Sequence, residues 1–347
     1  MPHVFADISS HGFGHLAQAA PVLNALRSLR ADLRLTIRSG LPRERLASRL
    51  AGDFEHIRET SDFGFVMKNA LDVDLPATAA RYREFHAEWP TRVRREVEFL
   101  RSTKPDLVFS DVAYLPLAGA AAAGIPSVAM CSLNWADLVG DCFRGESWLP
   151  TIHAEILSAY RGADTFLRTT PGMPMPELGN VIAIGPLAAP PELDRPEVAR
   201  QLGLPLNKRW VLVALGGFDF PLPVEHWPGR DDVLWLRPEA LRAGKVSFND
   251  LLATADAVIT KPGYGTFTEA AVHGVPLLYL RRPGWPEEPC LIEWLHDNAR
   301  AAEITRDQAL RGDLLPALDA LWASPLPPRP SATGVAEAAS ALLRLLP

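Results

Sequence analysis

Lys261-Pro-Gly-Tyr-Gly-Thr-Phe-Thr-Glu269 is the stretch from which the organisation of this 347-residue chain can be worked out. It follows an apolar run at 257–260 that is typical of a short buried strand, and it precedes a helical pattern at 270–274 that ends in a glycine. A strand, a glycine-containing turn and a helix in this order bring free N–H groups and the positive end of a helix dipole to one point. Such a point suits a phosphate group.

Individual residues of this turn fit the same interpretation. Gly263 and Gly265 allow a ligand to approach the backbone closely, and Thr266 and Thr268 are candidates to cap the helix. We expect Glu269 one turn into the helix, where a carboxylate could bind both hydroxyls of a ribose. The pattern by itself is equally compatible with a turn that needs glycine for its geometry alone.

A second glycine turn near the start of the chain has the same organisation. Residues 3–8 form a candidate strand, 9–15 the turn, 16–29 a helix with apolar residues at helical spacing, and 34–38 another strand. A strand, a helix and a strand in succession predict a parallel sheet.

Two histidines, His11 and His15, lie in this second turn, at the edge of the sheet where open α/β proteins bind ligands. The near-neutral pKa of histidine suits His15 to act as a general base on a hydroxyl group, with His11 as a possible assistant. The apolar run that ends at Asp111 predicts a strand that brings this carboxylate to the same edge, where it could orient His15 or cap the next helix. A structural hydrogen bond at the start of a helix is the alternative role for His15.

The length of the chain predicts two domains. We expect an N-terminal domain over residues 1–187, a C-terminal domain over 188–328, and a last helix within 329–347 that could pack back on the N-terminal domain. The fold class that follows is α/β, with two Rossmann-like, doubly wound domains that face a cleft.

Each domain should supply one wall of this cleft. His15 and Asp111 would come from the first wall. The second wall would contain Gly216 and Gly217, which directly follow an apolar strand at 210–215, together with the turn at 261–269, Glu287 and Glu288.

Composition narrows the functional classes. The net charge of −6 and the pI of about 5.9 argue against broad nucleic-acid binding. Cys131, Cys142 and Cys290 are too few and too scattered for a disulfide framework or a zinc site, and no signal peptide or membrane-spanning run is visible, so we expect a cytoplasmic protein without a metal. The arginines of a helix at 90–102 could touch an anionic membrane surface, although a solvated helix face has the same pattern. An aromatic-rich stretch at 53–90 could line an acceptor pocket or form ordinary core.

Seven short motifs, found in one order along most of the chain, support a specific resemblance. They are Ser10-His-Gly-Phe-Gly-His15, Ser110-Asp-Val112, Ala123-Gly-Ile-Pro-Ser-Val128, Asn134-Trp135, Pro171-Gly-Met-Pro-Met-Pro176, Lys261-Pro-Gly-Tyr-Gly-Thr266, and Arg281-Arg282 followed by Glu287-Glu288-Pro289. With these motifs the chain resembles glycosyltransferases of the GT-B fold, and more closely the glycosyltransferase-like N-terminal half of plant L-arabinokinase. The sequence contains no sugar-kinase domain, so the resemblance implies no kinase activity.

The resemblance implies a role for each site residue. His15 would be the base that acts on the acceptor, Glu269 would bind the ribose, and Glu287 and Glu288 would lie near the donor sugar. The helix start at 263–266 would hold the diphosphate. The implied donor site as a whole consists of Gly14, Gly216, Gly217, Lys261, Gly263, Tyr264, Gly265, Thr266, Glu269, Glu287 and Glu288.

We therefore expect an inverting, metal-independent glycosyltransferase of bacterial type. It would move a hexosyl or pentosyl group from a nucleotide-diphosphate sugar, with UDP as the favoured nucleotide, to an acceptor hydroxyl, and it would need no further cofactor. A sugar-nucleotide 2-epimerase of the same fold and a non-catalytic sugar-nucleotide-binding protein are the alternatives.

Overall fold

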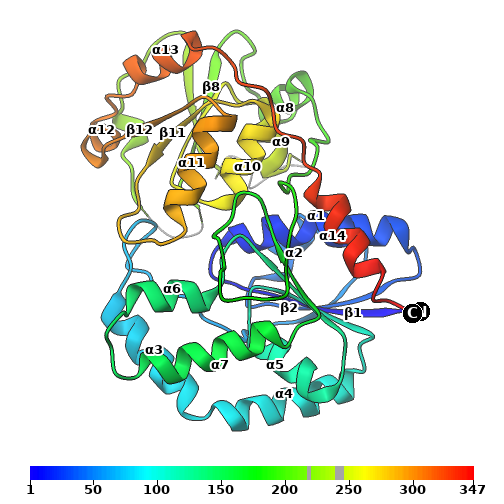
Figure 1. Cartoon of the computed structure of the whole chain (residues 1–347). Coiled ribbons are helices and arrows are strands. Elements are labelled where there is room, and N and C mark those ends of the chain that lie inside the picture. The colour runs from blue at the N-terminus through cyan, green and yellow to red at the C-terminus, as the bar shows by residue number, and fades with distance from the viewer. Residues whose placement is uncertain (217–219, 239–245) are drawn as a thin grey trace.

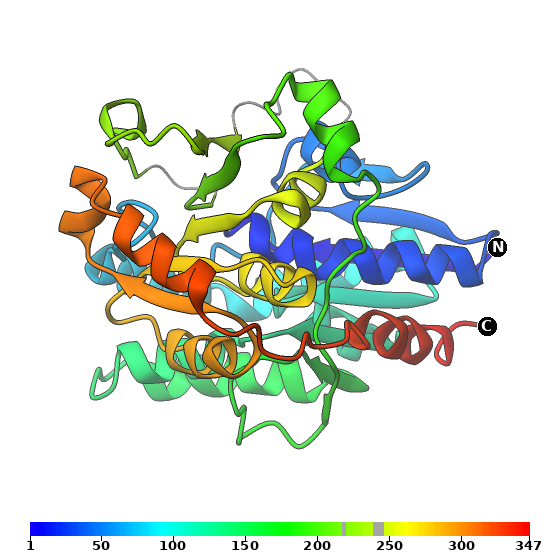
Figure 2. The ribbon, with the colours of Figure 1, turned by 90° about the horizontal axis from the view of Figure 1, so that it is seen from above.

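Two α/β lobes make up the protein, and the chain completes the first lobe before it enters the second (Figure 1). The computed structural model describes residues 1–216, 220–238 and 246–347. After the second lobe the chain returns to the first, where the final helix lies beside the first helix (Figure 2).

The N-terminal lobe is built on a parallel sheet in which, among the described residues, seven strands follow the order β3-β2-β1-β4-β5-β6-β7. The central strands are buried along their whole length, as expected for a sheet covered by helices on both faces. The strands are β1 (His3–Ile8), β2 (Arg34–Arg38), β3 (Glu55–Ile57), β4 (Leu107–Asp111), β5 (Ser127–Cys131), β6 (Thr165–Arg168) and β7 (Val181–Ala183).

The helices of this lobe follow the strands as crossover connections. Gly124 caps the carboxyl end of α5, and its left-handed φ of 71° allows the chain to turn back into β5. The helices are α1 (Phe13–Leu29), α2 (Arg43–Ala47), α3 (Leu75–Ala87), α4 (Trp89–Thr103), α5 (Leu115–Ala123), α6 (Trp135–Cys142) and α7 (Leu149–Arg161).

The C-terminal lobe has a second parallel sheet, which in the described part of the chain has five strands in the order β12-β11-β10-β8-β9. Its strands are β8 (Arg209–Ala214), β9 (Val233–Leu236), β10 (Ala257–Thr260), β11 (Leu277–Leu280) and β12 (Ala301–Ile304). Its helices are α8 (Arg195–Leu202), the 3₁₀ turn η1 (Val224–His226), α9 (Phe248–Thr254), α10 (Tyr264–His273), α11 (Glu288–Asn298), α12 (Arg306–Arg311) and α13 (Leu315–Ala323), and α14 (Gly334–Leu343) follows as the helix that packs on α1.

The order of the strands reverses at one point in each sheet. In the N-terminal lobe the reversal lies between β1 and β4, and in the C-terminal lobe it lies between β8 and β10. Ligands of open α/β sheets bind beyond the carboxyl ends of the strands at such switch points. His15, Asp111, Gly216 and Lys261 all lie at or just beyond the carboxyl ends of these four strands, so the topology and the motifs indicate the same residues.

The two parallel sheets expected from the sequence are confirmed. The expectation that Thr266 and Thr268 cap α10 is wrong, because the helix begins earlier, at Tyr264, with Gly263 as an N-cap that offers no side chain. The Thr268 hydroxyl instead donates to the Tyr264 and Gly265 carbonyls inside the helix.

A buried ion network joins the carboxyl ends of β1 and β2 to α4. Arg38 on β2 contacts Asp7 on β1 and makes a bidentate pair with Glu96 on α4, at 2.7 and 2.9 Å. All three side chains are buried. Because each charge has its partner, the network ties β1, β2 and α4 together without an unpaired ion.

Among the described residues, none of the helices combines the length and the apolar character that a membrane span requires.

Candidate functional site

His15 and Asp111 form a buried pair at the switch point of the first sheet. His15 lies in the first turn of α1, and Asp111 is the last residue of β4, so the two loops place them together. The His15 Nδ1 donates to Asp111 Oδ1 at 2.9 Å, and both side chains are almost completely buried. Because the carboxylate accepts the Nδ1 proton, Nε2 is the nitrogen left to accept a proton from a ligand.

The surroundings of the pair shift the pKa values of both His15 and Asp111. Burial alone would lower the pKa of His15, but the hydrogen bond to Asp111 and the neighbouring Cys131 raise it well above its usual range. Burial also raises the pKa of Asp111. The Cys131 Sγ lies 3.8 Å from His15 Nδ1, and one atom from each of these three residues falls within 4.8 Å of the others, so the group could hold a metal ion.

His11 has a different environment from His15. Its Nε2 is 2.9 Å from the Phe65 carbonyl oxygen, which can only accept a hydrogen bond, so Nε2 carries a proton. Its ring stacks on Trp285 of the C-terminal lobe with 5.8 Å between centroids, and it meets Trp135 edge-on at 5.4 Å. Burial and the nearby His15, Arg282 and Lys261 charges lower the pKa of His11 to about 3. His11 is therefore a neutral ring between the two lobes.

The amino-terminal ends of α1 and α10 meet at the interface between the lobes. A Cβ atom added to Gly265 would lie 2.9 Å from the Ala17 Cβ and 4.0 Å from the Gly14 Cα, so glycine allows this close approach. A Cβ added to Gly14 would meet nothing within 4 Å, which shows open space beside the start of α1. The first N–H groups of a helix have no partner inside the helix, and each helix start carries a partial positive charge. Two such ends at one place favour an anion between them.

Lys261 lies between the two glycine turns of the C-terminal lobe. Its Nζ is 3.8 Å from the place of a Cβ on Gly216 and 3.9 Å from that of a Cβ on Gly263. Burial, followed by the Arg282 charge, lowers the pKa of Lys261 to about 7. Gly216 has a left-handed φ of 92°, which glycine adopts without strain, and Gly217 lies outside the described residues.

Glu269 does not face an empty space. Its Oε1 accepts a hydrogen bond from Arg49 Nη1 of the N-terminal lobe at 2.6 Å, and the residue is 2% exposed. The Tyr264 side chain is also engaged between the lobes, because its hydroxyl accepts from the Leu187 N–H at 2.9 Å and donates to the Thr170 carbonyl at 3.1 Å. Thr266 is partly exposed in the first turn of α10.

Glu287 and Glu288 lie at the start of α11 but have different contacts. Glu287 crosses the interface: it accepts from the Ser132 hydroxyl at 2.6 Å and from the Trp285 indole N–H at 3.0 Å. Glu288 stays within its own lobe, where it accepts from Arg281 Nε and, at 2.6 Å, from the Arg282 main-chain N–H. Glu288 thus fixes the turn between β11 and α11.

The structure adds site residues that the sequence reasoning did not single out. Arg49, Ser132 and Trp285 donate hydrogen bonds to the predicted site residues Glu269 and Glu287, and the main chain of Arg282 donates to Glu288. Ser132 directly follows a buried strand, so the rule that ligand-binding residues come after strands could have found it. Arg49 follows a short surface helix and carries no such signal.

An aromatic cluster adjoins His11 on the N-terminal side. Phe65 contacts Trp135 and Trp285, and Tyr82 contacts Phe63 and Phe65. Several members come from the stretch 53–90, so most of these rings are core and a few reach the lobe interface.

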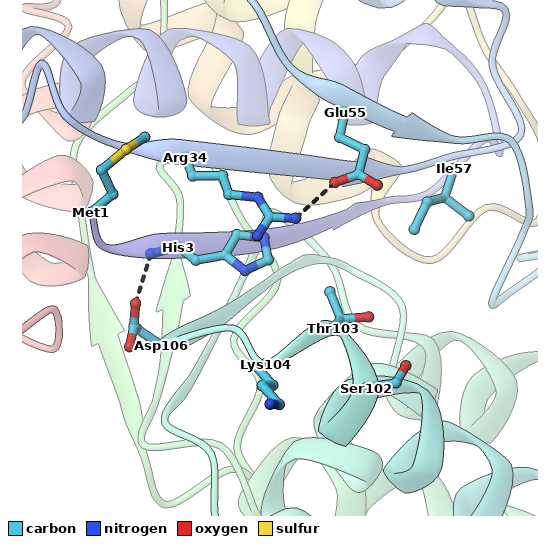
Figure 3. A pocket seen from close by; sticks show the side chains of 9 residues that line it. All are labelled: Met1, His3, Arg34, Glu55, Ile57, Ser102, Thr103, Lys104 and Asp106. Atoms are coloured by element: carbon cyan, nitrogen blue, oxygen red, sulfur yellow. Dashed lines mark hydrogen bonds and ion pairs between the residues drawn. The ribbon is translucent and has the colours of Figure 1, made fainter.

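A cavity of about 700 Å³ lies elsewhere, at the amino-terminal ends of β1 and β2, where Arg34 pairs with Glu55 (Figure 3). Ligands of open sheets bind at the opposite edge, so this cavity is separate from the candidate site.

Comparison with known proteins points to the same class of fold. No family model matches the chain. L-arabinokinase of Arabidopsis thaliana is 28% identical over 327 residues, which cover 90% of this chain and 31% of that protein, in its N-terminal part. The chain thus spans about a third of the length of this relative.

Solved glycosyltransferase structures match nearly the whole chain. The calicheamicin glycosyltransferase CalG4 superposes with a TM-score of 0.59 at 18% identity, covering 99% of this chain and 94% of that one. Arabidopsis thaliana UGT89C1 has a TM-score of 0.59 at 15% identity and covers 99% of each chain. Phytolacca americana UGT2, complexed with UDP-2-fluoro-glucose and pterostilbene, has a TM-score of 0.56 at 13% identity and covers 99% of this chain and 94% of that one. The fold is that of the GT-B glycosyltransferases.

Proposed function

We propose that this protein transfers a sugar from UDP, or a closely similar nucleoside diphosphate, to a hydroxyl group of an acceptor. The observation that carries the proposal is the meeting of two helix amino-termini, α1 and α10, with the Lys261 ammonium beside them. Together they form a site for a diphosphate in which protein groups alone supply the compensating charge. The UDP-2-fluoro-glucose bound to Phytolacca americana UGT2, a protein of the same fold, supports a nucleotide sugar as the ligand.

The reaction would be a single displacement with inversion at the anomeric carbon. His15 Nε2 takes the proton from the acceptor hydroxyl, whose oxygen then forms a bond to the anomeric carbon of the donor. The bond from that carbon to the diphosphate oxygen breaks, and the electron pair leaves with the diphosphate. Asp111 positions His15 and stabilises the imidazolium that forms, because it already holds the Nδ1 proton.

Stabilisation of the leaving diphosphate is the main electrostatic task of the site. The helix N–H groups and Lys261 are fixed before the reaction, so they need no reorganisation as negative charge develops. Loss of one fixed donor of this kind typically raises the barrier by about 2.7–4 kcal/mol. The proposal includes no metal ion and no cofactor other than the nucleotide sugar.

Glu269 and Glu287 have roles that involve a change of partner. Glu269 would bind the ribose hydroxyls, and for this it must release Arg49. Glu287 lies at the interface and is better placed than Glu288 to contact the donor sugar, because Glu288 is held inside the C-terminal lobe.

Release of UDP from UDP-sugars, measured with pooled small-molecule acceptors, tests the proposal. We expect release in the wild type and none in His15→Asn, while UDP binding is kept in that variant. Full turnover by His15→Asn would remove His15 from the mechanism.

Analysis of the sugar nucleotide after incubation without acceptor separates the alternatives. An epimerase would convert the sugar nucleotide alone, and a binding protein would leave it unchanged even with acceptors present.

A further inference from the structure

Arg282 lies at the interface between the lobes with its charge poorly compensated. The residue is 5% exposed, and its Nε is a buried donor without a hydrogen-bond partner among the described residues. Its nearest carboxylate oxygen, Glu287 Oε2, is 3.9 Å from Nη2, which is too far for a hydrogen bond. A buried guanidinium without acceptors is costly, so its presence calls for a ligand.

The two neighbouring acids are engaged by other groups. Both Glu287 oxygens already accept hydrogen bonds, one from Ser132 and the other from Trp285. Both Glu288 oxygens are also occupied, by Arg281 and by the main-chain N–H of Arg282. Neither carboxylate accepts a hydrogen bond from the Arg282 side chain, and the shorter of the two separations is the 3.9 Å to Glu287.

The orientation of Arg282 restricts the shape of the missing partner. Its guanidinium carbon lies 4.0 Å from the centre of the Trp285 ring, a cation–π contact that covers one face of the guanidinium. The Trp285 indole is itself held by Glu287. With a face covered, the N–H donors at the edge remain, and they match a planar group with two acceptor oxygens in parallel.

Arg282 and Lys261 serve different parts of the site. Lys261 lies beside the glycine turns, where the diphosphate is proposed to bind. Arg282 lies on Trp285, which stacks on His11 and contacts the aromatic cluster of the N-terminal lobe. This position is toward the sugar and the acceptor. Burial lowers the pKa of Arg282 to about 10, so the group keeps its charge at neutral pH.

We propose that the sugar bound beside Arg282 carries a carboxylate, as uronic acids do, and that the guanidinium holds this carboxylate through two parallel hydrogen bonds. The inference rests on the proposed function and names the substrate class of that same site. The carboxylate can belong to the sugar of the donor or to the acceptor, and the experiment distinguishes these two sources.

Calorimetric titration of the intact chain provides the test. The donor arm compares UDP, UDP-glucose and UDP-glucuronate. The acceptor arm compares glucuronate with glucose in the presence of saturating UDP. Each is measured on the wild type, on Arg282→Gln and on Arg282→Lys. Arg311→Gln, a change of the same charge at an exposed position of the same lobe, is the matched control.

We expect the acidic ligand to bind at least about tenfold more tightly than its neutral counterpart in one of the two arms, and the arm that shows this preference identifies the source. Arg282→Gln should abolish the preference, and Arg282→Lys should lose most of it because an ammonium lacks the planar fork. The control should keep it. Arg282→Gln should also melt at the same temperature as the wild type or higher, because it removes a buried charge without acceptors. A merely structural arginine would lower the melting temperature instead.

Besides a lower melting temperature of Arg282→Gln, three binding results would overturn the inference. If UDP binds but neither arm shows a preference for the acidic ligand, the carboxylate assignment is wrong while the proposed function stands. The same holds if the preference persists in Arg282→Gln. If neither UDP nor any UDP-sugar binds, the proposed function fails and the inference fails with it.

Discussion

Replacement of Arg49 by alanine should destabilise the protein and at the same time release Glu269 for ligand binding. In the wild type, Arg49 Nη1 lies 2.6 Å from Glu269 Oε1, and the Glu269 side chain is 2% exposed while that of Arg49 is 20% exposed. Removing one partner of a buried ion pair costs about 3–5 kcal/mol. Because Arg49 retains some solvent contact, we expect the lower end, about 3 kcal/mol, and a melting temperature roughly 4 °C lower.

The same variant should not weaken UDP binding. If Glu269 binds the ribose, the wild type must break the Arg49 pair when it binds UDP, whereas Arg49→Ala has no pair to break. We expect Arg49→Ala to bind UDP as tightly as the wild type or more tightly, and Glu269→Gln to bind it more weakly. Thermal melts and calorimetric titrations measure both quantities. Exposed Arg58 offers a control, because Arg58→Ala should change stability by less than about 0.5 kcal/mol.

Two results would refute this reasoning. A loss of UDP affinity in Arg49→Ala as large as that in Glu269→Gln would mean that Arg49 contacts the nucleotide itself. An unchanged melting temperature in Arg49→Ala would mean that the pair between the lobes contributes little in solution.

Three further predictions concern titration and the core. Because Asp111 raises the pKa of His15 and a base must be unprotonated, kcat/KM should rise with pH through a value above 6.5, and Asp111→Asn should move this limb to lower pH; an unmoved limb would contradict the pairing. Burial lowers the pKa of Lys261 to about 7, whereas the terminal phosphate of UDP is already ionised above a pKa of about 6. Because Lys261 loses its charge as the pH rises, the affinity for UDP should fall up to about tenfold per pH unit from pH 7 upward. Lys261→Met should bind UDP weakly, and its affinity should not show this fall. Arg38→Met leaves two buried carboxylates unpaired and should cost about 3–5 kcal/mol in a thermal or denaturant melt, so a loss below 1 kcal/mol would show that the network is not stabilising.

The fold could be predicted well from local patterns. The strands 3–8, 34–38 and 257–260 were expected at the bounds that the structure has, because short segments rich in apolar and β-branched residues beside turns are a strong local signal. The edge strands β3 and β7 were not expected. Each has only three residues, which is too short for a periodic pattern to mark it, and its pairing depends on the neighbouring strand.

The site was harder to predict because it lies between two lobes. The meeting of His15 with Asp111 follows from sheet topology, since both end up beyond neighbouring strands of one sheet. The pairs Arg49–Glu269 and Ser132–Glu287 join residues 220 and 155 positions apart, and no local pattern encodes them. The same limit applies to Arg282, because the lack of a partner for its Nε depends on which side chains surround it in the fold.

Comparison of UDP with uridine in a calorimetric titration tests the central claim most directly. In the proposed complex, most of the binding energy of UDP comes from its diphosphate, which lies between the amino-termini of α1 and α10, beside Lys261. Helix ends and charge-assisted hydrogen bonds of this kind together contribute about 3 kcal/mol, so UDP should bind at least about a hundredfold more tightly than uridine. Equal affinity for the two ligands, or no binding of UDP, would contradict the claim that this interface is a diphosphate site.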